Sequence, residues 1–214
     1  MSDRSPPKLA PQNRIRPPLQ QRSQVAWNRI LDAGMQILIE QGRGALTIQA
    51  TCRRAKVSPT ALYARVDGLS GLFWAIYDRG IGEVIMTYER LLKVAAQAEG
   101  SVERLRAVVR AMCENFRRHE RFLHQIINIS VADEALRERG SRESLVYVER
   151  VAAVLAQQPA GAAADVARMV HQECVFRAMY GDQWLSRRPE SWPAFTRRLT
   201  TMALGRFGWL ELDQ

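Results

Sequence analysis

The chain has 214 residues, of which 47% are hydrophobic and 25% are charged, a composition typical of a globular protein with a substantial core. No stretch approaches the roughly 20 consecutive apolar residues that a membrane-spanning helix needs, and residues 1–20 lack the apolar core of a secretory signal. These features argue against an integral membrane protein and a secreted one, so we expect a cytoplasmic protein without a membrane partner.

The positive charge is concentrated in the first third of the chain. Residues 1–80 contain 12 Lys and Arg against 5 Asp and Glu, a net +7, whereas residues 81–214 contain 19 against 17. A basic segment beside a nearly neutral one indicates that the first part meets a polyanion, although a solvated basic surface gives the same count.

Residues 1–21 are rich in Pro, Gln, Arg and Ser, and we expect them to form a flexible basic arm. Arg14, Arg16 and Arg22 lie on or beside this arm. They are candidates for phosphate or minor-groove contacts, and an arm without such a role is an equal alternative.

Helical periodicity then begins. Apolar residues recur at helical spacing and stop at Gly42, which predicts a helix over about residues 22–41. Thr47 is a favourable N-cap and predicts a short helix over about 47–55.

A third helix is predicted from Ser58 to about Arg65. Ser58 is a favourable N-cap, and Pro59 falls at the first helical position, where its missing N–H costs nothing. Asp67 and Gly68 end this helix, and a fourth begins at about residue 70.

The rest of the chain is also helical in pattern, without the alternation of a β-strand, so the predicted fold class is all-α. We expect an N-terminal DNA-binding domain over residues 22–68 and a second domain over residues 69–214. The further predicted helices cover about 82–98, 102–118, 120–128, 131–138, 141–157, 162–186 and 190–206.

Two short helices separated by about four residues form the core of a helix-turn-helix. The reading helix must start sharply, carry small or hydrogen-bonding side chains in its first turn, and be held by apolar residues, a role that suits Val57 and Leu62. Tyr63 is placed to donate its hydroxyl to a phosphate, or else it is a core aromatic residue. The candidate DNA-binding residues are Thr47, Gln49, Ser58, Pro59, Thr60, Ala61, Tyr63 and Arg65.

Residues 29–42 resemble the opening helix of TetR-family transcriptional regulators. Residues 47–55, with Val57-Ser58 and Leu62-Tyr63, are similar to that family's helix-turn-helix, and Leu72 continues the similarity. The resemblance implies about nine helices, with three that bind DNA followed by a ligand-binding and dimerisation domain.

The same resemblance implies how the protein works. A homodimer, built on the last two long helices, binds a palindromic double-stranded DNA operator with half-sites about one helical turn apart. A small-molecule effector releases the DNA, so that the protein acts as a repressor, and no cofactor is implied.

Several positions depart from the family pattern. Lys56 stands where the family has Gly in the turn, Thr51 stands where Ile is usual, and Leu69 stands where a Lys often contacts phosphate. Cys52 stands where Ala is common, and Val66 stands where an aromatic residue usually follows the recognition helix. These departures keep an alternative open, a helical small-molecule or protein-binding module that has lost specific DNA binding.

The effector pocket is expected within residues 69–214. Arg177 lies among apolar neighbours and requires an acidic partner or an anionic ligand, unless its head group reaches solvent. Most of the other candidates are expected to be core residues, and about a third of them are expected to line a pocket. The candidate lining residues are Met112, Phe116, His119, Tyr147, Cys174, Arg177 and Trp184.

The remaining chemistry-bearing residues do not form a known motif. Cys52, Cys113 and Cys174 are scattered and are expected to be reduced and buried, with a redox-sensing thiol as the less favoured alternative. His171 and Cys174 have the i, i+3 spacing of metal ligands, but no second pair accompanies them, so no metal site is predicted. The sequence lacks a Gly-rich phosphate loop, a nucleophile motif and paired carboxylates in a recognisable setting, which argues against an enzyme.

Overall fold

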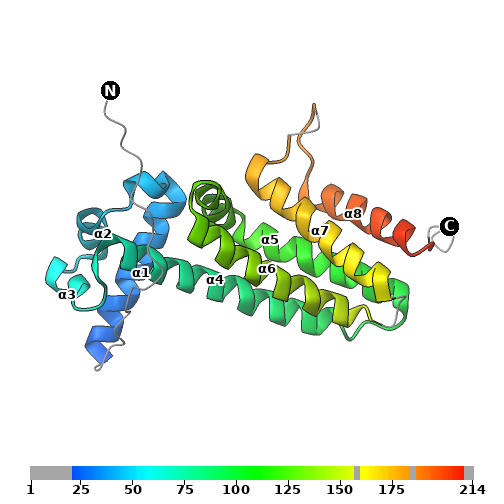
Figure 1. Ribbon diagram of the computed structural model, residues 1–214, viewed down its shortest axis with the longest axis horizontal. Coiled ribbons are helices and arrows are strands. Elements are labelled where there is room, and N and C mark those ends of the chain that lie inside the picture. The colour runs from blue at the N-terminus through cyan, green and yellow to red at the C-terminus, as the bar shows by residue number, and fades with distance from the viewer. Residues whose placement is uncertain (1–20, 157–159, 184–186, 210–214) are drawn as a thin grey trace. The chain divides into compact units, whose positions relative to one another are not determined.

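The computed structural model describes residues 21–156, 160–183 and 187–209. Over these residues the secondary structure is helical and contains no β-strand (Figure 1), which confirms the predicted fold class. None of the described helices is both long enough and apolar enough to cross a membrane. The elements are α1 (Gln21–Gln41), η1 (Arg43–Ala45), α2 (Ile48–Ala55), α3 (Pro59–Tyr63), α4 (Gly68–Ala95), α5 (Ser101–Ala132), α6 (Glu134–Val154), α7 (Ala160–Tyr180) and α8 (Trp192–Arg206).

Four predicted helix breaks were wrong. The chain runs through residue 82 within α4, through residues 119 and 129–130 within α5, and through residue 140 within α6. A glycine inside a helix costs only about 1 kcal/mol relative to alanine, which the burial of long apolar faces outweighs. The chain turns instead at Gly100 and Gly181, whose φ angles of 79° and 81° end the preceding helices.

The contacts divide the chain into two compact units. The first contains the residues up to Glu83 together with Asn128–Arg139, and the second contains Val84–Ile127 and the chain from Gly140 onward. Helices α1, α2 and α3 belong to the first unit, and α7 and α8 belong to the second.

The core of the first unit holds α1, α2 and α3 together. Leu38 of α1, Leu62 of α3 and Leu72 of α4 are completely buried, and burying such a side chain contributes about 1.5–3 kcal/mol. Gly34 of α1 packs closely on α4, because a Cβ at this position would lie 2.3 Å from Cδ1 of Ile76. Helix α3 packs against α1 and α2 within this unit.

An ion pair adds a second connection between α1 and α2. The Arg54 guanidinium donates to both carboxylate oxygens of Glu40 at 2.8 and 2.9 Å, and to the side-chain oxygen of Gln36 at 3.0 Å. Bidentate geometry of this kind fixes direction as well as distance.

The turn between α2 and α3 is closed by Lys56 in the left-handed conformation, with φ 55° and ψ 48°. Its N–H donates to the Arg53 carbonyl at 3.4 Å, and the Val57 N–H donates to the Cys52 carbonyl at 3.1 Å. This is the usual way to end a helix before a sharp turn. Among the described residues, Lys56 is the only non-glycine residue with a positive φ.

Thr51 is buried, and its hydroxyl group still makes a hydrogen bond. The hydroxyl donates to the Thr47 carbonyl one turn earlier, at 2.8 Å. A threonine in a helix can adopt a rotamer that makes this bond, so the polar residue at this core position leaves no unpaired group.

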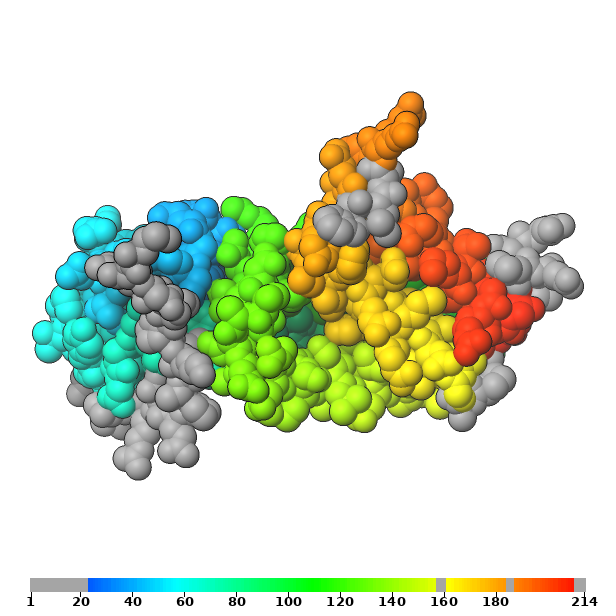
Figure 2. All heavy atoms as spheres, turned by 45° about the horizontal axis from the view of Figure 1, so that its top comes forward, coloured from blue at the N-terminus to red at the C-terminus, as the bar shows by residue number. Residues whose placement is uncertain are grey.

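The second unit ends in a helix pair. Helices α7 and α8 lie side by side at its surface (Figure 2). Arg177 of α7 is buried between the rings of Trp192 and Phe195, at 4.3 and 4.8 Å from their centroids. It donates to the Glu190 carbonyl at 2.7 Å, with the Glu190 carboxylate at 3.9 Å. Arg177 therefore holds the connection between the two helices, and it has an acidic partner.

Replacing Lys56 with glycine should stabilise the protein. The substitution Lys56→Gly removes a left-handed side chain that costs about 1 kcal/mol, so we expect the unfolding free energy in urea to rise by up to that amount. The exposed Arg53 is the matched control, because Arg53→Gly places glycine inside α2 and should lower stability by about 1 kcal/mol. An equal decrease in the unfolding free energy of both variants would contradict backbone strain at Lys56.

Candidate nucleic-acid interface and effector cavity

The start of α3 is built as a sharp, exposed helix end. The Ser58 hydroxyl accepts the Ala61 N–H at 3.3 Å, and Pro59 occupies the first turn. Thr60 is exposed, and Tyr63 keeps 53% of its surface in solvent while Leu62 between them is completely buried. The helix therefore buries one side chain and presents its neighbours outward, as a reading helix must. The exposure also decides that Tyr63 is not a core aromatic residue.

The other predicted DNA contacts occupy different settings. Thr47 and Gln49 are exposed at the start of α2, where the Thr47 hydroxyl accepts the Ala50 N–H at 3.1 Å. Ala61 is half-buried. Arg65 is half-buried as well, and its guanidinium donates to the Ser23 hydroxyl of α1. Arg65 thus joins α1 to the segment after α3. The predicted contact with DNA requires the guanidinium either to break its hydrogen bond with Ser23 or to use its other N–H groups.

Two exposed cations at the C-terminal end of α2 were not among the predicted DNA-binding residues. Arg53 and Lys56 are exposed, whereas the charge of Arg54 is engaged with Glu40. Arg53 and Arg54 are adjacent in the sequence, and the sequence does not show which of them faces α1. Only the packing of α2 on α1 separates them. Of the predicted arm residues, Arg14 and Arg16 and the side chain of Arg22 lie outside the described residues.

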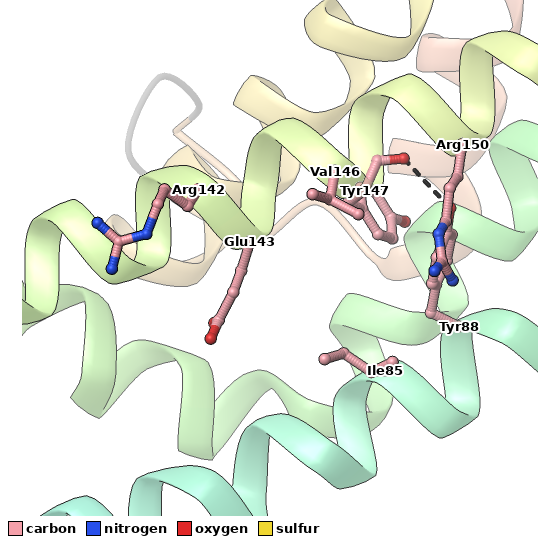
Figure 3. Close-up of a pocket in the computed structure, with 7 residues that line it drawn as sticks. All are labelled: Ile85, Tyr88, Arg142, Glu143, Val146, Tyr147 and Arg150. Atoms are coloured by element: carbon pink, nitrogen blue, oxygen red, sulfur yellow. Dashed lines mark hydrogen bonds between the residues drawn. The ribbon is translucent and has the colours of Figure 1, made fainter.

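The second unit contains a cavity of about 230 Å³ between α4 and α6 (Figure 3). Its walls are mainly apolar. Figure 3 shows Tyr88 and Tyr147 side by side, with their ring centroids 4.1 Å apart, and the Tyr88 hydroxyl donates to the Tyr147 carbonyl at 3.1 Å. Ligand pockets are lined in this way, by apolar and aromatic side chains with a few polar groups. The lining residues are Ile85, Tyr88, Arg142, Glu143, Val146, Tyr147 and Arg150.

Several buried polar atoms of the second unit have no hydrogen-bond partner among the described residues, and three of them belong to uncharged side chains. These three are Oδ1 of Asn115, Oη of Tyr147 and Nδ1 of His171, from α5, α6 and α7. The His171 ring contacts the rings of Tyr147 and Phe116, with centroids at 5.2 and 5.5 Å. Burial lowers the pKa of His171 to about 4 and raises the pKa of Tyr147. An unpaired buried polar group costs about 1–3 kcal/mol, so these atoms are available to a group that pairs with them.

Among the predicted effector-pocket residues that the structure describes, only Tyr147 lines the cavity. Met112, Phe116 and Cys174 are buried in the core of the second unit. His119 is half-buried with Nε2 3.0 Å from the Thr87 hydroxyl, and Trp184 lies outside the described residues. Tyr88 and Ile85 were missed, because the sequence does not show which faces of α4 and α6 meet. Within the described part of the chain, no three His, Cys, Asp or Glu side chains come close enough to hold a metal ion.

Solved structures of bacterial regulators share this fold. A protein described as a TetR-family transcriptional regulator from Mesorhizobium loti is 14% identical, with a TM-score of 0.72 over 88% of this chain and 98% of that one. A TetR/AcrR-family regulator from Thermobifida fusca is 17% identical, with a TM-score of 0.59 over 86% and 97%. A fatty acid degradation regulator from Bacillus halodurans is 12% identical, with a TM-score of 0.60 over 84% and 95%.

No family model and no curated protein sequence matches the chain. The similarity to these regulators is therefore visible in the fold and not in the sequence as a whole. The protein has the fold of TetR/AcrR-family transcriptional regulators over most of its length. This confirms the architecture that the resemblance near the N-terminus predicted.

Burial of His171 predicts a loss of stability in acid. Its pKa falls from 6.5 to about 4 on folding. Between pH 6.5 and pH 4 the imidazole is therefore protonated in the unfolded chain and neutral in the folded chain. Stability should therefore fall as pH decreases from 6.5 to 4, by on the order of 3 kcal/mol in total.

The variant His171→Gln isolates this effect from other titrating groups. Its unfolding free energy, measured in urea across the same pH range, should fall less steeply than that of the original protein. Parallel pH profiles for the two proteins would show that the His171 pKa is not lowered on folding.

Proposed function

We propose that the protein is a DNA-binding transcriptional regulator that binds a palindromic operator as a homodimer and is released by a small-molecule effector. The observation that carries this proposal is the geometry of α3. Leu62 is buried while Thr60 and Tyr63 face solvent, which is the arrangement that lets the start of a helix approach base edges. The shared fold of transcriptional regulators supports the same reading.

The charges near α3 support phosphate contact. Arg53 and Lys56 are exposed at the end of α2, immediately before the turn into α3. Exposed cations beside a reading helix position a protein on the DNA backbone without specifying sequence. The Tyr63 hydroxyl would act in the same way, from the outer face of α3.

Exposed apolar side chains on α7 and α8 support dimerisation. Phe176 and Tyr180 of α7 keep 41% and 46% of their surfaces exposed, with their rings 4.7 Å apart, and Met202 of α8 keeps 41%. Aromatic and methionine side chains are enriched in protein interfaces. A two-fold contact through these helices would give the paired reading heads that a palindrome requires.

The cavity of the second unit supports an effector. Its volume of about 230 Å³ lies below the roughly 300 Å³ at which pockets for drug-sized ligands begin, so the effector would be small. Tyr88 and Tyr147 would contact its apolar part.

DNA binding is tested by gel shift on the DNA that flanks the protein's own gene. The Tyr63→Phe variant removes one hydroxyl and keeps the ring, and it should weaken binding by about tenfold, the value of a hydrogen bond to a charged group. Thr60→Glu should abolish the shift, because like charges placed together cost several kcal/mol. Binding by the original protein should weaken steeply with salt.

The control for added charge is Ser141→Glu, at an exposed position of α6 in the second unit. It should leave the shift unchanged. A folded dimer that gives no shift at low salt would reject the regulator and favour the alternative, a helical binding module that has lost DNA recognition.

Dimerisation is tested by sedimentation of a charged variant. Phe176→Asp should raise the dimer dissociation constant by at least about a hundredfold, because a carboxylate would be buried without a partner. Met86→Asp is the matched control, since Met86 of α4 is 64% exposed and lies outside α7 and α8. If both variants dissociate to the same extent, or if neither dissociates, the dimer interface does not include this face of α7.

A further inference from the structure

The cavity between α4 and α6 is small and has an aromatic wall. Its volume is about 230 Å³, and a cavity of about 150 Å³ already accommodates benzene. The rings of Tyr88 and Tyr147 meet at this wall, with their centroids 4.1 Å apart (Figure 3). Aromatic rings attract one another beyond the effect of the apolar area that they bury. A molecule with a single aromatic ring therefore matches both the size and the surface of the cavity.

The Tyr147 hydroxyl adds a polar requirement. Tyr147 lines the cavity, and its Oη is buried without a hydrogen-bond partner among the described residues. The hydroxyl of Tyr88, which also lines the cavity, already donates to the Tyr147 carbonyl at 3.1 Å. A phenolic hydroxyl can both donate and accept a hydrogen bond, and a buried hydroxyl without a partner costs free energy that a ligand hydroxyl would recover.

The charged residues that line the cavity are exposed or have partners of their own. Arg142 and Arg150 are exposed, and Arg150 is ion-paired with an acidic residue of α4. Figure 3 shows the Arg142 guanidinium directed away from the two tyrosines, and Glu143 has an interaction partner within the chain. The His171 ring, 5.2 Å from the Tyr147 ring between centroids, is uncharged at neutral pH because burial lowers its pKa to about 4. An ion beside these rings would lose its hydration without gaining a paired charge.

We infer that this cavity binds a small, uncharged molecule with one aromatic ring and one hydroxyl group, which pairs with Oη of Tyr147. Phenol is the simplest member of this class. The inference names the chemical class of the effector and therefore rests on the proposed function. Two explanations compete with it. An ordered water molecule would pair with Oη, or an anionic ligand would be held by Arg142 at the rim.

The ligand class is tested by isothermal titration calorimetry on the full-length protein without DNA. The probes are phenol, toluene and benzoate, which share one ring and differ in the hydroxyl and in charge. The Tyr147→Phe variant removes only the hydroxyl. It should raise the Kd of phenol by about tenfold, the value of one hydrogen bond, and should leave the Kd of toluene unchanged.

Three results would overturn the inference. The first is that neither phenol nor toluene binds the original protein. The second is that Tyr147→Phe changes the Kd of phenol and of toluene to the same extent, because the ligand hydroxyl would then not contact Tyr147. The third is that benzoate binds the original protein more tightly than phenol does, because the ligand would then be an anion.

The stability of the protein without ligand separates the inference from a bound water molecule. If Oη of Tyr147 has no partner, Tyr147→Phe removes an unsatisfied buried atom and should raise the unfolding free energy in urea. An unchanged or lower unfolding free energy would show that the hydroxyl already has a partner, and it would reject the ligand contact.

The position of the site is tested by filling the cavity. Ile85 lines it, so Ile85→Trp should abolish the binding of phenol and of toluene. Met86→Trp is the matched control, because Met86 is the next residue of α4, is 64% exposed and does not line the cavity. It should keep both affinities. Unchanged phenol binding by Ile85→Trp would place the ligand elsewhere and overturn the inference. If Ile85→Trp fails to fold, Tyr147→Phe still decides the result.

This inference and the proposed function fail in different experiments. A missing gel shift rejects the DNA-binding regulator, whereas calorimetry without DNA decides the class of the ligand.

Discussion

The burial of Leu62 is the contact on which the presentation of α3 depends. The helix has five residues, and isolated helices shorter than about 12 residues are marginal in water. Its shape therefore comes from packing on α1 and α2, from the Ser58 cap and from Pro59 in the first turn. If that packing loosened, Thr60 and Tyr63 would lose the fixed spacing that the proposed recognition of DNA requires.

The buried polar groups of the second unit differ in how fully they are paired. The Arg177 guanidinium donates to the Glu190 carbonyl and lies over two aromatic rings, which fixes the connection from α7 to α8, while its Nε has no hydrogen-bond partner among the described residues. Asn115, Tyr147 and His171 each keep one buried polar atom unpaired. A satisfied charge holds a structure together, whereas unsatisfied atoms leave free energy for a ligand to recover.

Local signals in the sequence were enough for the N-terminal helices but not for the long ones. Thr47 and Ser58 cap α2 and α3 as expected, because capping bonds join residues only three positions apart. The predicted breaks at residues 82 and 140 failed, because a glycine penalty of about 1 kcal/mol is smaller than the gain from burying a long helix face. Whether a glycine ends a helix is thus decided by packing that lies far away in the sequence.

The sequence by itself determined the all-helical class and the start of α3, since both follow from periodicity and from hydrogen bonds between near neighbours. It also placed Tyr147 and Arg177 among the candidate pocket residues, but it did not show which side chains surround them. Only the tertiary structure decided that Tyr88 lines the cavity and that Arg54, and not Arg53, is the arginine paired with α1. These outcomes depend on which helix faces meet, and helical periodicity gives the direction of a face but not the identity of its partner.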